Sequence, residues 1–236
     1  MTQYIDEEKI RKLRELEFER TKSHTQVMYD RPSHLARKKT IEEMIIACKA
    51  DCLDGKALDY GCAEGLYCEY LLSEGFRNVY GVDISMLKIE EARKKYASKG
   101  IRFFAVDEFN RMNNIGKFKL ILCLEVLQHV NNYRKLLAEL KDIMEDDGYL
   151  LVSIPNLSKN NEHEYANINN EMTVEQLLHE VGGAGFGKQN AIWKFNSKLF
   201  YDEIGDEFKV INIRNVDTPD GAKKNLWTVG LLTKNK

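Results

Sequence analysis

The sequence predicts an α/β protein built around a largely parallel sheet, and three observations indicate this. Residues 56–83 have the pattern of a buried strand, a turn of small residues, a helix, a second short strand and an acid. Residues 118–124 form an almost continuous apolar run, which is typical of a central parallel strand covered on both faces. The last two apolar runs, at 208–213 and 225–232, flank a Pro-Asp-Gly turn and predict a hairpin-like pair of antiparallel strands.

About 50 residues precede the first predicted strand. Residues 4–22 are charged but place Ile5, Ile10, Leu13, Leu16 and in part Phe18 on one face, so we expect a helix that packs on the domain or on a second subunit of a homo-oligomer. A polar and aromatic segment follows, and then a second helix that runs to about Lys49. We expect residues 1–50 to form a helical extension whose central loop is either a lid over a ligand or an ordinary surface loop.

The turn between the first strand and its helix is flanked by acids. A lone glycine-rich turn of this kind is common in α/β proteins and is weak evidence of a ligand. Here Asp59 stands two residues before Gly61, and Asp83 follows Gly65 by 18 residues, close to the offset of a ribose-binding acid. Because a carboxylate beside the turn would repel a pyrophosphate, Asp59 disfavours a dinucleotide and favours a cationic ligand.

The residues Asp59-Tyr-Gly-Cys-Ala-Glu-Gly65 and Gly81-Val-Asp-Ile-Ser85 resemble motifs I and II of the class I, or Rossmann-like, S-adenosylmethionine-dependent methyltransferases. The resemblance covers about residues 56–155. It implies a three-layer fold with a mostly parallel seven-stranded sheet and an antiparallel final strand. It also implies S-adenosyl-L-methionine as cofactor and S-adenosyl-L-homocysteine as product. The usual motif has Gly where this chain has Ala63, so we expect Ala63 to adopt an ordinary, negative φ.

The resemblance also implies roles for residues at the carboxyl ends of the strands. Asp83 is expected to accept hydrogen bonds from the ribose diol. Asp107 is expected to accept one from the adenine amino group, with Val106 and Glu108 beside the ring, although Asp107 could otherwise cap the next turn. Segments before the first strand often cover the cofactor in this family. The expected cofactor-binding set is Asp59, Tyr60, Gly61, Cys62, Ala63, Gly65, Asp83, Ile84, Val106, Asp107, Glu108, Leu124 and Glu125, with Tyr29 and Arg31 from the lid.

The residues Glu125-Val-Leu-Gln-His129-Val follow the central apolar strand and resemble the motif IV region of the family. An ordinary histidine has a pKa near ~6.5, which suits proton transfer at neutral pH. In some family members a histidine in this region is the base, and we expect His129 to be the base here. His163, between two glutamates, and His24 and His34 in the lid are further candidates. Histidines in such positions are more often surface or helix-cap residues than bases.

The C-terminal part adds an insertion to the expected methyltransferase domain, residues 51–236. A helix over 131–144 and a strand over 149–154 complete the parallel part of the sheet. Residues 156–195 are polar and contain one predicted helix, from Thr173. Because this insertion leaves the carboxyl end of a strand, where open α/β sheets bind ligands, we expect it to lie over the active site.

Composition narrows the classes of function. A formal net charge of −2 and a pI near 6.3 argue against a broadly basic surface that binds nucleic acid. No apolar run approaches the ~20 residues that span a bilayer, and the charged N-terminus does not resemble an export signal. The five cysteines show no Cys-x-x-Cys pair, which predicts reduced thiols in a cytoplasmic protein and no metal site.

These features predict an enzyme that transfers a methyl group from S-adenosylmethionine to a small or medium acceptor by in-line displacement. The sulfonium activates the methyl group, so the protein has mainly to position the reactants and exclude water. The expected acceptor is a hydroxyl of a glycan, lipid or secondary metabolite. Methylation of RNA or protein and a non-catalytic cofactor-binding module are the alternatives, and Asp59 disfavours a dehydrogenase.

Overall fold

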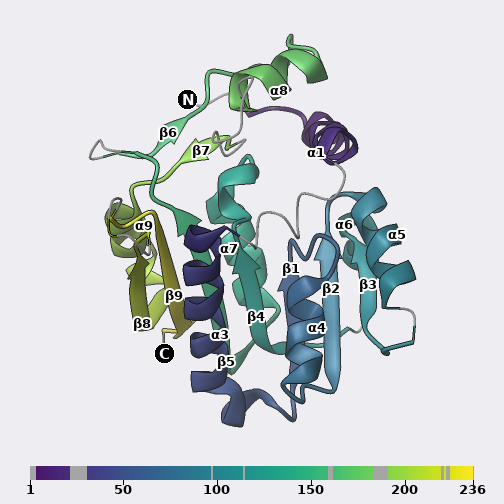
Figure 1. Cartoon of the computed structure of the whole chain (residues 1–236), viewed down its shortest axis with the longest axis vertical. Coiled ribbons are helices and arrows are strands. Elements are labelled where there is room, and N and C mark those ends of the chain that lie inside the picture. The colour runs from purple at the N-terminus through teal and green to yellow at the C-terminus, as the bar shows by residue number, and fades with distance from the viewer. Residues whose placement is uncertain are drawn as a thin grey trace.

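A computed structural model of the chain describes residues 4–21, 31–96, 98–113, 115–158, 162–182, 191–218, 221 and 224–235 (Figure 1). Seven strands form one central sheet: β1 (Lys56–Tyr60), β2 (Asn78–Asp83), β3 (Arg102–Ala105), β4 (Phe118–Leu124), β5 (Met144–Pro155), β8 (Phe208–Val216) and β9 (Trp227–Lys234). Their order is β3-β2-β1-β4-β5-β9-β8. Strands β1 to β5 run parallel, and β9 runs antiparallel to both of its neighbours.

The predicted sheet, mostly parallel with an antiparallel final strand, is confirmed. Several strands differ from their expected bounds, which were 101–106 for the third strand, 149–154 for the fifth, and 208–213 and 225–232 for the last two. β3 ends at Ala105, because Val106 already begins the short helix α6 (Val106–Asn110). β5 starts at Met144, where its first residue pairs with Phe118 across a shift in register.

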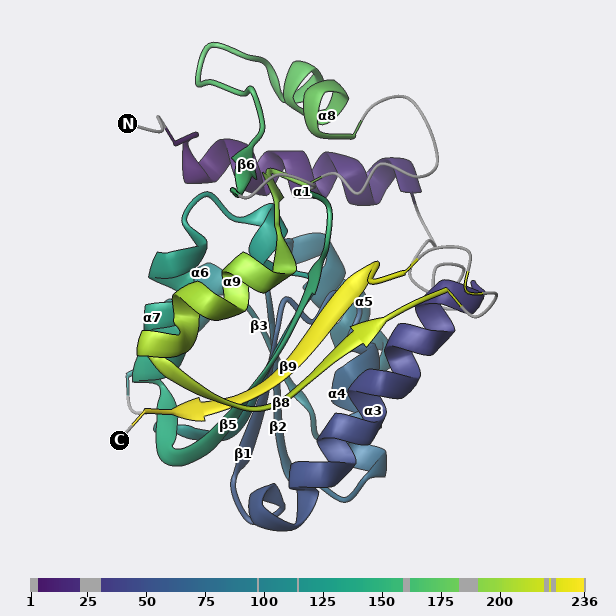
Figure 2. The ribbon, with the colours of Figure 1, turned by 90° about the vertical axis from the view of Figure 1, so that its left-hand side faces the viewer.

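Helices cover both faces of the sheet and complete the three layers (Figure 2). One face carries α3 (Pro32–Cys52), α4 (Leu66–Ser73) and α5 (Met86–Lys95), and the other carries α6, α7 (Tyr133–Asp142) and α9 (Ser197–Glu203). β4 is buried on both sides, as its sequence predicts. Ile121 and Cys123 belong to the core beside α7 and α9, whereas Leu120 and Leu122 belong to the core beside α3.

A third group of elements lies beyond the carboxyl ends of β1, β2 and β4 (Figure 1). It contains α1 (Glu7–Thr21), α8 (Val174–Gly182) and the two-stranded pair β6 (Glu164–Tyr165) and β7 (Trp193–Lys194). α1 packs against α8, although about 150 residues separate them in the sequence. α3 extends past residue 50 and packs on β5 and β9. The division of the chain at residue 50 therefore stays a prediction.

Candidate functional site

The turn after β1 is tied to the end of β2. The backbone N–H groups of Gly61 and Cys62 both donate to the carbonyl of Val82, at 2.7 and 2.9 Å. Gly61 has φ 82°, and a Cβ there would lie 2.2 Å from Cγ2 of Val126. Both the backbone angle and the close approach therefore require glycine at this position.

The expectation that Ala63 has an ordinary φ is wrong, because its φ is +48°. In this conformation the N–H of Ala63 donates to Oδ2 of Asp83 at 2.9 Å. A left-handed conformation costs a residue with a Cβ roughly 1–2 kcal/mol. The hydrogen bond to a buried carboxylate offsets this cost, so the turn accommodates alanine at a position with positive φ.

Asp83 is only 6% exposed and is held by two backbone hydrogen bonds. Besides Ala63, the N–H of Ser85 donates to Oδ1 at 2.9 Å. A carboxylate has about four lone-pair sites. Two acceptor sites therefore remain, at the position where a ribose diol is expected.

A first cavity, of about 70 Å³, opens beside the turn. Of the predicted site residues it brings together Asp59, Gly61, Cys62, Ala63, Leu124 and Glu125. The carboxyl of Asp59 is 3% exposed, and this burial raises its pKa to about 7, while a hydrogen bond from the Cys68 thiol opposes the shift and the charge of Asp83 adds to it. A buried carboxyl whose pKa is about 7 ionises readily when a cation binds beside it.

The first cavity is also lined by residues that the sequence analysis missed: Arg37, Ile41, Leu66 and Tyr67. Arg37 is 7% exposed, and its NH1 group forms an ion pair with Oε2 of Glu125 at 2.8 Å. Among the described residues its Nε has no hydrogen-bond partner. One signal could have identified it. Arg37 lies four and eight residues before the apolar Ile41 and Ile45, and so on the buried face of the predicted helix.

Glu125 follows β4 and contacts α3, β5 and β9. It has φ +57°, and its N–H donates to the carbonyl and hydroxyl oxygens of Ser153. Its carboxylate accepts hydrogen bonds from the Ser153 hydroxyl at 3.0 Å and from Nε1 of Trp227 at 2.9 Å. Burial lowers the pKa of the His34 imidazole to about 4, so its Nδ1 accepts a hydrogen bond from NH2 of Arg37 at 3.2 Å. Arg37 is therefore held with its guanidinium at the wall of the cavity.

A second cavity, of about 150 Å³, is lined by Ile84, the residue that follows Asp83. It is lined by the predicted residues Ile84, Val106 and Asp107, and by Met86 and Ala105. Its remaining wall comes from Glu7, Glu8 and Arg11 of α1. The larger space thus lies under the N-terminal helix, which was expected only to pack on the domain or on another subunit.

Several predicted site residues line neither cavity. Tyr60 and Gly65 adjoin the first cavity along the backbone, and Glu108 accepts hydrogen bonds from Arg93 and from the N–H of Ala105. Arg31 is exposed at the start of α3. His129 ends a short 3-10 turn, η1 (Leu127–His129), and is half-buried. Tyr29 and His24 lie outside the described residues.

A family model described as "Methyltransferase domain" matches residues 10–186, which is most of the chain. The chain belongs to this family. Its matched part contains α1 from Ile10 onward, the lining of the first cavity, the lining of the second cavity except Glu7 and Glu8, and the insertion as far as α8.

Curated relatives of this methyltransferase domain include ubiquinone biosynthesis O-methyltransferases. The protein from Rickettsia conorii is 26% identical over 140 residues, which are 59% of this chain and 48% of the relative. The protein from Actinobacillus pleuropneumoniae serotype 7 is 30% identical over 134 residues, 53% of this chain and 56% of the relative. The match therefore spans about half the length of these relatives.

Solved structures of other methyltransferases share the fold. The 1,6-didemethyltoxoflavin-N1-methyltransferase of Burkholderia thailandensis, with 1,6-didemethyltoxoflavin and S-adenosylhomocysteine bound, has a TM-score of 0.68 at 16% identity, covering 100% of this chain and 93% of its own. The N-methyltransferase NodS of Bradyrhizobium japonicum, in complex with S-adenosylhomocysteine, has a TM-score of 0.63 at 14% identity, covering 97% and 99%. At these identities the likeness is one of fold alone.

The described part of this methyltransferase lacks two kinds of feature. Within those residues, no cluster of three or more His, Cys, Asp or Glu side chains is arranged to hold a metal ion. None of the described helices combines the length and apolar character needed to cross a membrane.

Proposed function

We propose that this chain transfers the methyl group of S-adenosylmethionine to a small or medium acceptor. The observation that carries the proposal is the pair of opposite charges in the first cavity. The carboxyl of Asp59 and the guanidinium of Arg37 are both buried there. The amino-acid end of the cofactor has an ammonium, a sulfonium and a carboxylate, which these two side chains complement. Arg37 would bind the carboxylate, and Asp59 would ionise beside the cations.

The second cavity would take the adenosine. Asp83 accepts from Ala63 of the first cavity and precedes Ile84 of the second, and it has acceptor sites for the ribose hydroxyls. Ile84 and Val106 offer apolar surface to the adenine ring, and Asp107 offers an acceptor to its amino group. One extended ligand would thus lie along the carboxyl ends of β1, β2 and β3, with its reactive sulfur near the turn.

The proposed acceptor atom is a hydroxyl oxygen. The curated relatives carry the name O-methyltransferase, which supports oxygen, while the match to only half of their length leaves their substrates as proposals for this chain. The cofactor supplies an electrophilic methyl group when bound. The chain must then align the acceptor with that group and exclude water, which can lower the barrier by ~7–11 kcal/mol. A hydroxyl also needs a base, and we assign this role to His129.

We place the reaction in the cytoplasm, with no nucleic acid as substrate. All five cysteines are buried free thiols, which suits a reducing compartment. The near-neutral charge balance offers no general attraction for a polyanion.

Calorimetry with S-adenosylhomocysteine tests the cofactor site. The wild-type chain should bind it, and Asp83→Asn should weaken binding by about 1.5–3 kcal/mol, or roughly 10- to 150-fold, because charge-assisted hydrogen bonds to the ribose are lost. Asp54→Asn is the matched control, since Asp54 is an exposed acid near the opposite end of β1. Unchanged affinity in Asp83→Asn would remove Asp83 from the ribose role, and no binding by the wild type would end the proposal.

A transfer assay with labelled cofactor tests the acceptor and the base. Pools of hydroxyl compounds, amines, RNA and proteins identify the acceptor class by which pool becomes labelled. With a hydroxyl acceptor, His129→Ala should slow transfer by about 100-fold or more and leave S-adenosylhomocysteine binding intact. His179→Ala, at an exposed position on α8, should change neither. Full activity of His129→Ala would show that another group is the base or that none is needed.

A further inference from the structure

The proposed function leaves the charged side chains of α1 that face the second cavity without a role. Glu7, Glu8 and Arg11 line this cavity together with Ile84 and Val106. The family motifs all lie later in the chain, so nothing in them assigns these residues to the cofactor. The cavity proposed for the adenine ring therefore has a cation in its lining as well as apolar surface.

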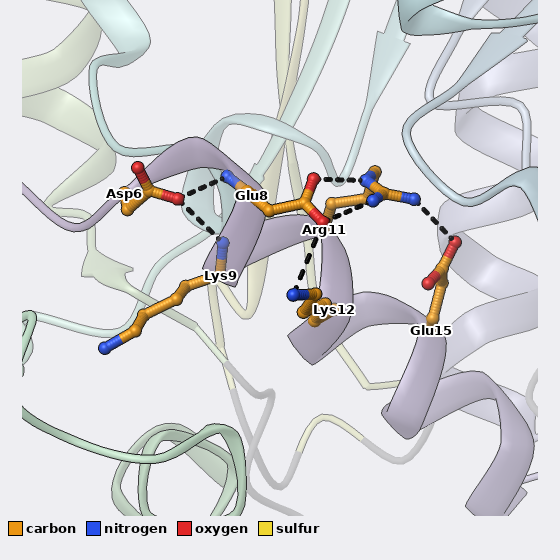
Figure 3. Close-up of polar contacts among 6 residues, drawn as sticks. All are labelled: Asp6, Glu8, Lys9, Arg11, Lys12 and Glu15. Carbon is orange, nitrogen blue, oxygen red and sulfur yellow. Dashed lines mark hydrogen bonds and ion pairs between the residues drawn. The ribbon is translucent and has the colours of Figure 1, made fainter.

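Arg11 is held in a fixed position by its neighbours on α1, as Figure 3 shows. Its Nε donates to Oε2 of Glu8 at 2.8 Å and its NH2 donates to Oε1 of the same carboxylate. Its NH1 also donates to Glu15 at 3.4 Å. Such a two-point contact fixes the plane of the guanidinium as well as its position. The side chain is 34% exposed, so one of its surfaces remains accessible.

The helix that carries Arg11 is itself anchored over the cavity. Ile5, Ile10 and Leu13 are buried in the main core. At the start of α1 the N–H of Asp6 donates to Oδ1 of Asn170 at 2.7 Å, and Nζ of Lys9 donates to the carbonyl of Met172 at 2.9 Å. Arg11 therefore keeps its place relative to β2 and β3.

We propose that Arg11 stacks its guanidinium on the adenine ring of the bound cofactor and so makes α1 part of the cofactor site. The inference rests on the proposed function. A guanidinium is planar and weakly hydrated and stacks well on aromatic rings. Ile84 and Val106 contact the other face of the ring, and Asp107 accepts from its edge. Arg11 therefore recognises the nucleoside end of the ligand, whereas Arg37 recognises the amino-acid end.

Two ligands separate these roles: S-adenosylhomocysteine, and 5′-methylthioadenosine, which has the adenosine and the thioether but lacks the amino-acid end. Calorimetry on the full chain should show that Arg11→Ala weakens both ligands by the same factor, about fivefold. Arg37→Ala should weaken S-adenosylhomocysteine alone. Lys12→Ala is the matched control, because Lys12 also pairs with Glu8 but does not line the cavity. It should leave both affinities unchanged.

Arg11→Lys separates stacking from charge. A lysine keeps the charge but not the plane, so this variant should bind both ligands as weakly as Arg11→Ala. Full affinity in Arg11→Lys would overturn stacking, and full affinity in Arg11→Ala would overturn any contact with adenine. A loss limited to S-adenosylhomocysteine would place Arg11 at the amino-acid end and also overturn the inference. If the wild type bound neither ligand, the proposed function would fail and the inference with it. Melting temperatures without ligand identify any variant that fails to fold.

Discussion

Asp59 lies inside the protein beside the first cavity, with a pKa that burial raises to about 7. In the unfolded chain the same carboxyl has a pKa near ~3.9. Between these two values the folded state holds a proton that the unfolded state has lost. Asp59 thus contributes to stability fully below about pH 4, and this contribution is lost as the pH rises through about 7.

Asp59→Asn should remove this dependence on pH. The free energy of unfolding of the wild type should fall between pH 5 and 7 by up to about 1.4 kcal/mol per pH unit more than that of the variant. Urea unfolding at pH 5, 6, 7 and 8 measures the difference. Over the same range the affinity of the wild type for S-adenosylhomocysteine should rise, because its ammonium binds the ionised carboxylate, and the variant should bind weakly at every pH. Parallel stability curves would show that Asp59 titrates normally.

At the scale of single residues, the local motif was predictable and its distant partners were not. Asp59, Gly61 and Asp83 follow from spacing along the chain, since one turn brings them together. Trp227 reaches the Glu125 carboxylate from 102 residues away, a distance in sequence over which no spacing rule operates. The prediction of an ordinary φ for Ala63 was wrong for a different reason. The expectation weighed the cost of positive φ but not the Asp83 carboxylate that offsets it.

At the scale of elements, periodicity predicted most helices and strands but not what each one covers. The pattern of α1 identified its buried face, with Ile5, Ile10 and Leu13. It gave no information on the opposite, charged face, where Arg11 borders a cavity. A charged face usually meets only solvent, and the packing of α1 across the strand ends shows that part of this one also borders a cavity.

The end of β4 illustrates how the elements converge on the site. Glu125 leaves the strand in a left-handed conformation, which turns its carboxylate toward Arg37 of α3 and Trp227 of β9. Arg37 is placed by a helix that packs on the sheet, and Trp227 by a strand of the sheet itself. The position of Arg37 in the cavity therefore depends on the sheet order as well as on α3.

At the scale of the whole molecule, one buried residue connects three segments through hydrogen bonds of its side chain and its backbone. Asn131 is 5% exposed and precedes α7. Its Nδ2 donates to the carbonyl of Ile5 at 2.6 Å, and its Oδ1 accepts from the hydroxyl of Tyr165 at 3.1 Å. Its carbonyl accepts from Nε1 of Trp193 at 2.9 Å. The segment that begins α1, the insertion and the end of the sheet therefore meet at this residue.

Because Asn131 links these segments, we expect its substitution to weaken cofactor binding as well as stability. Asn131→Ala breaks one buried and one half-buried hydrogen bond and should lower the free energy of unfolding by about 1–3 kcal/mol. Because α1 is then held less firmly over the second cavity, the affinity for 5′-methylthioadenosine should fall as well. Asn170→Ala is the control. It removes exposed hydrogen bonds between the insertion and the segment that begins α1. It should therefore have a smaller effect on the free energy of unfolding and on the affinity. A variant of Asn131 that loses stability but keeps full affinity would show that α1 binds the nucleoside without support from the insertion.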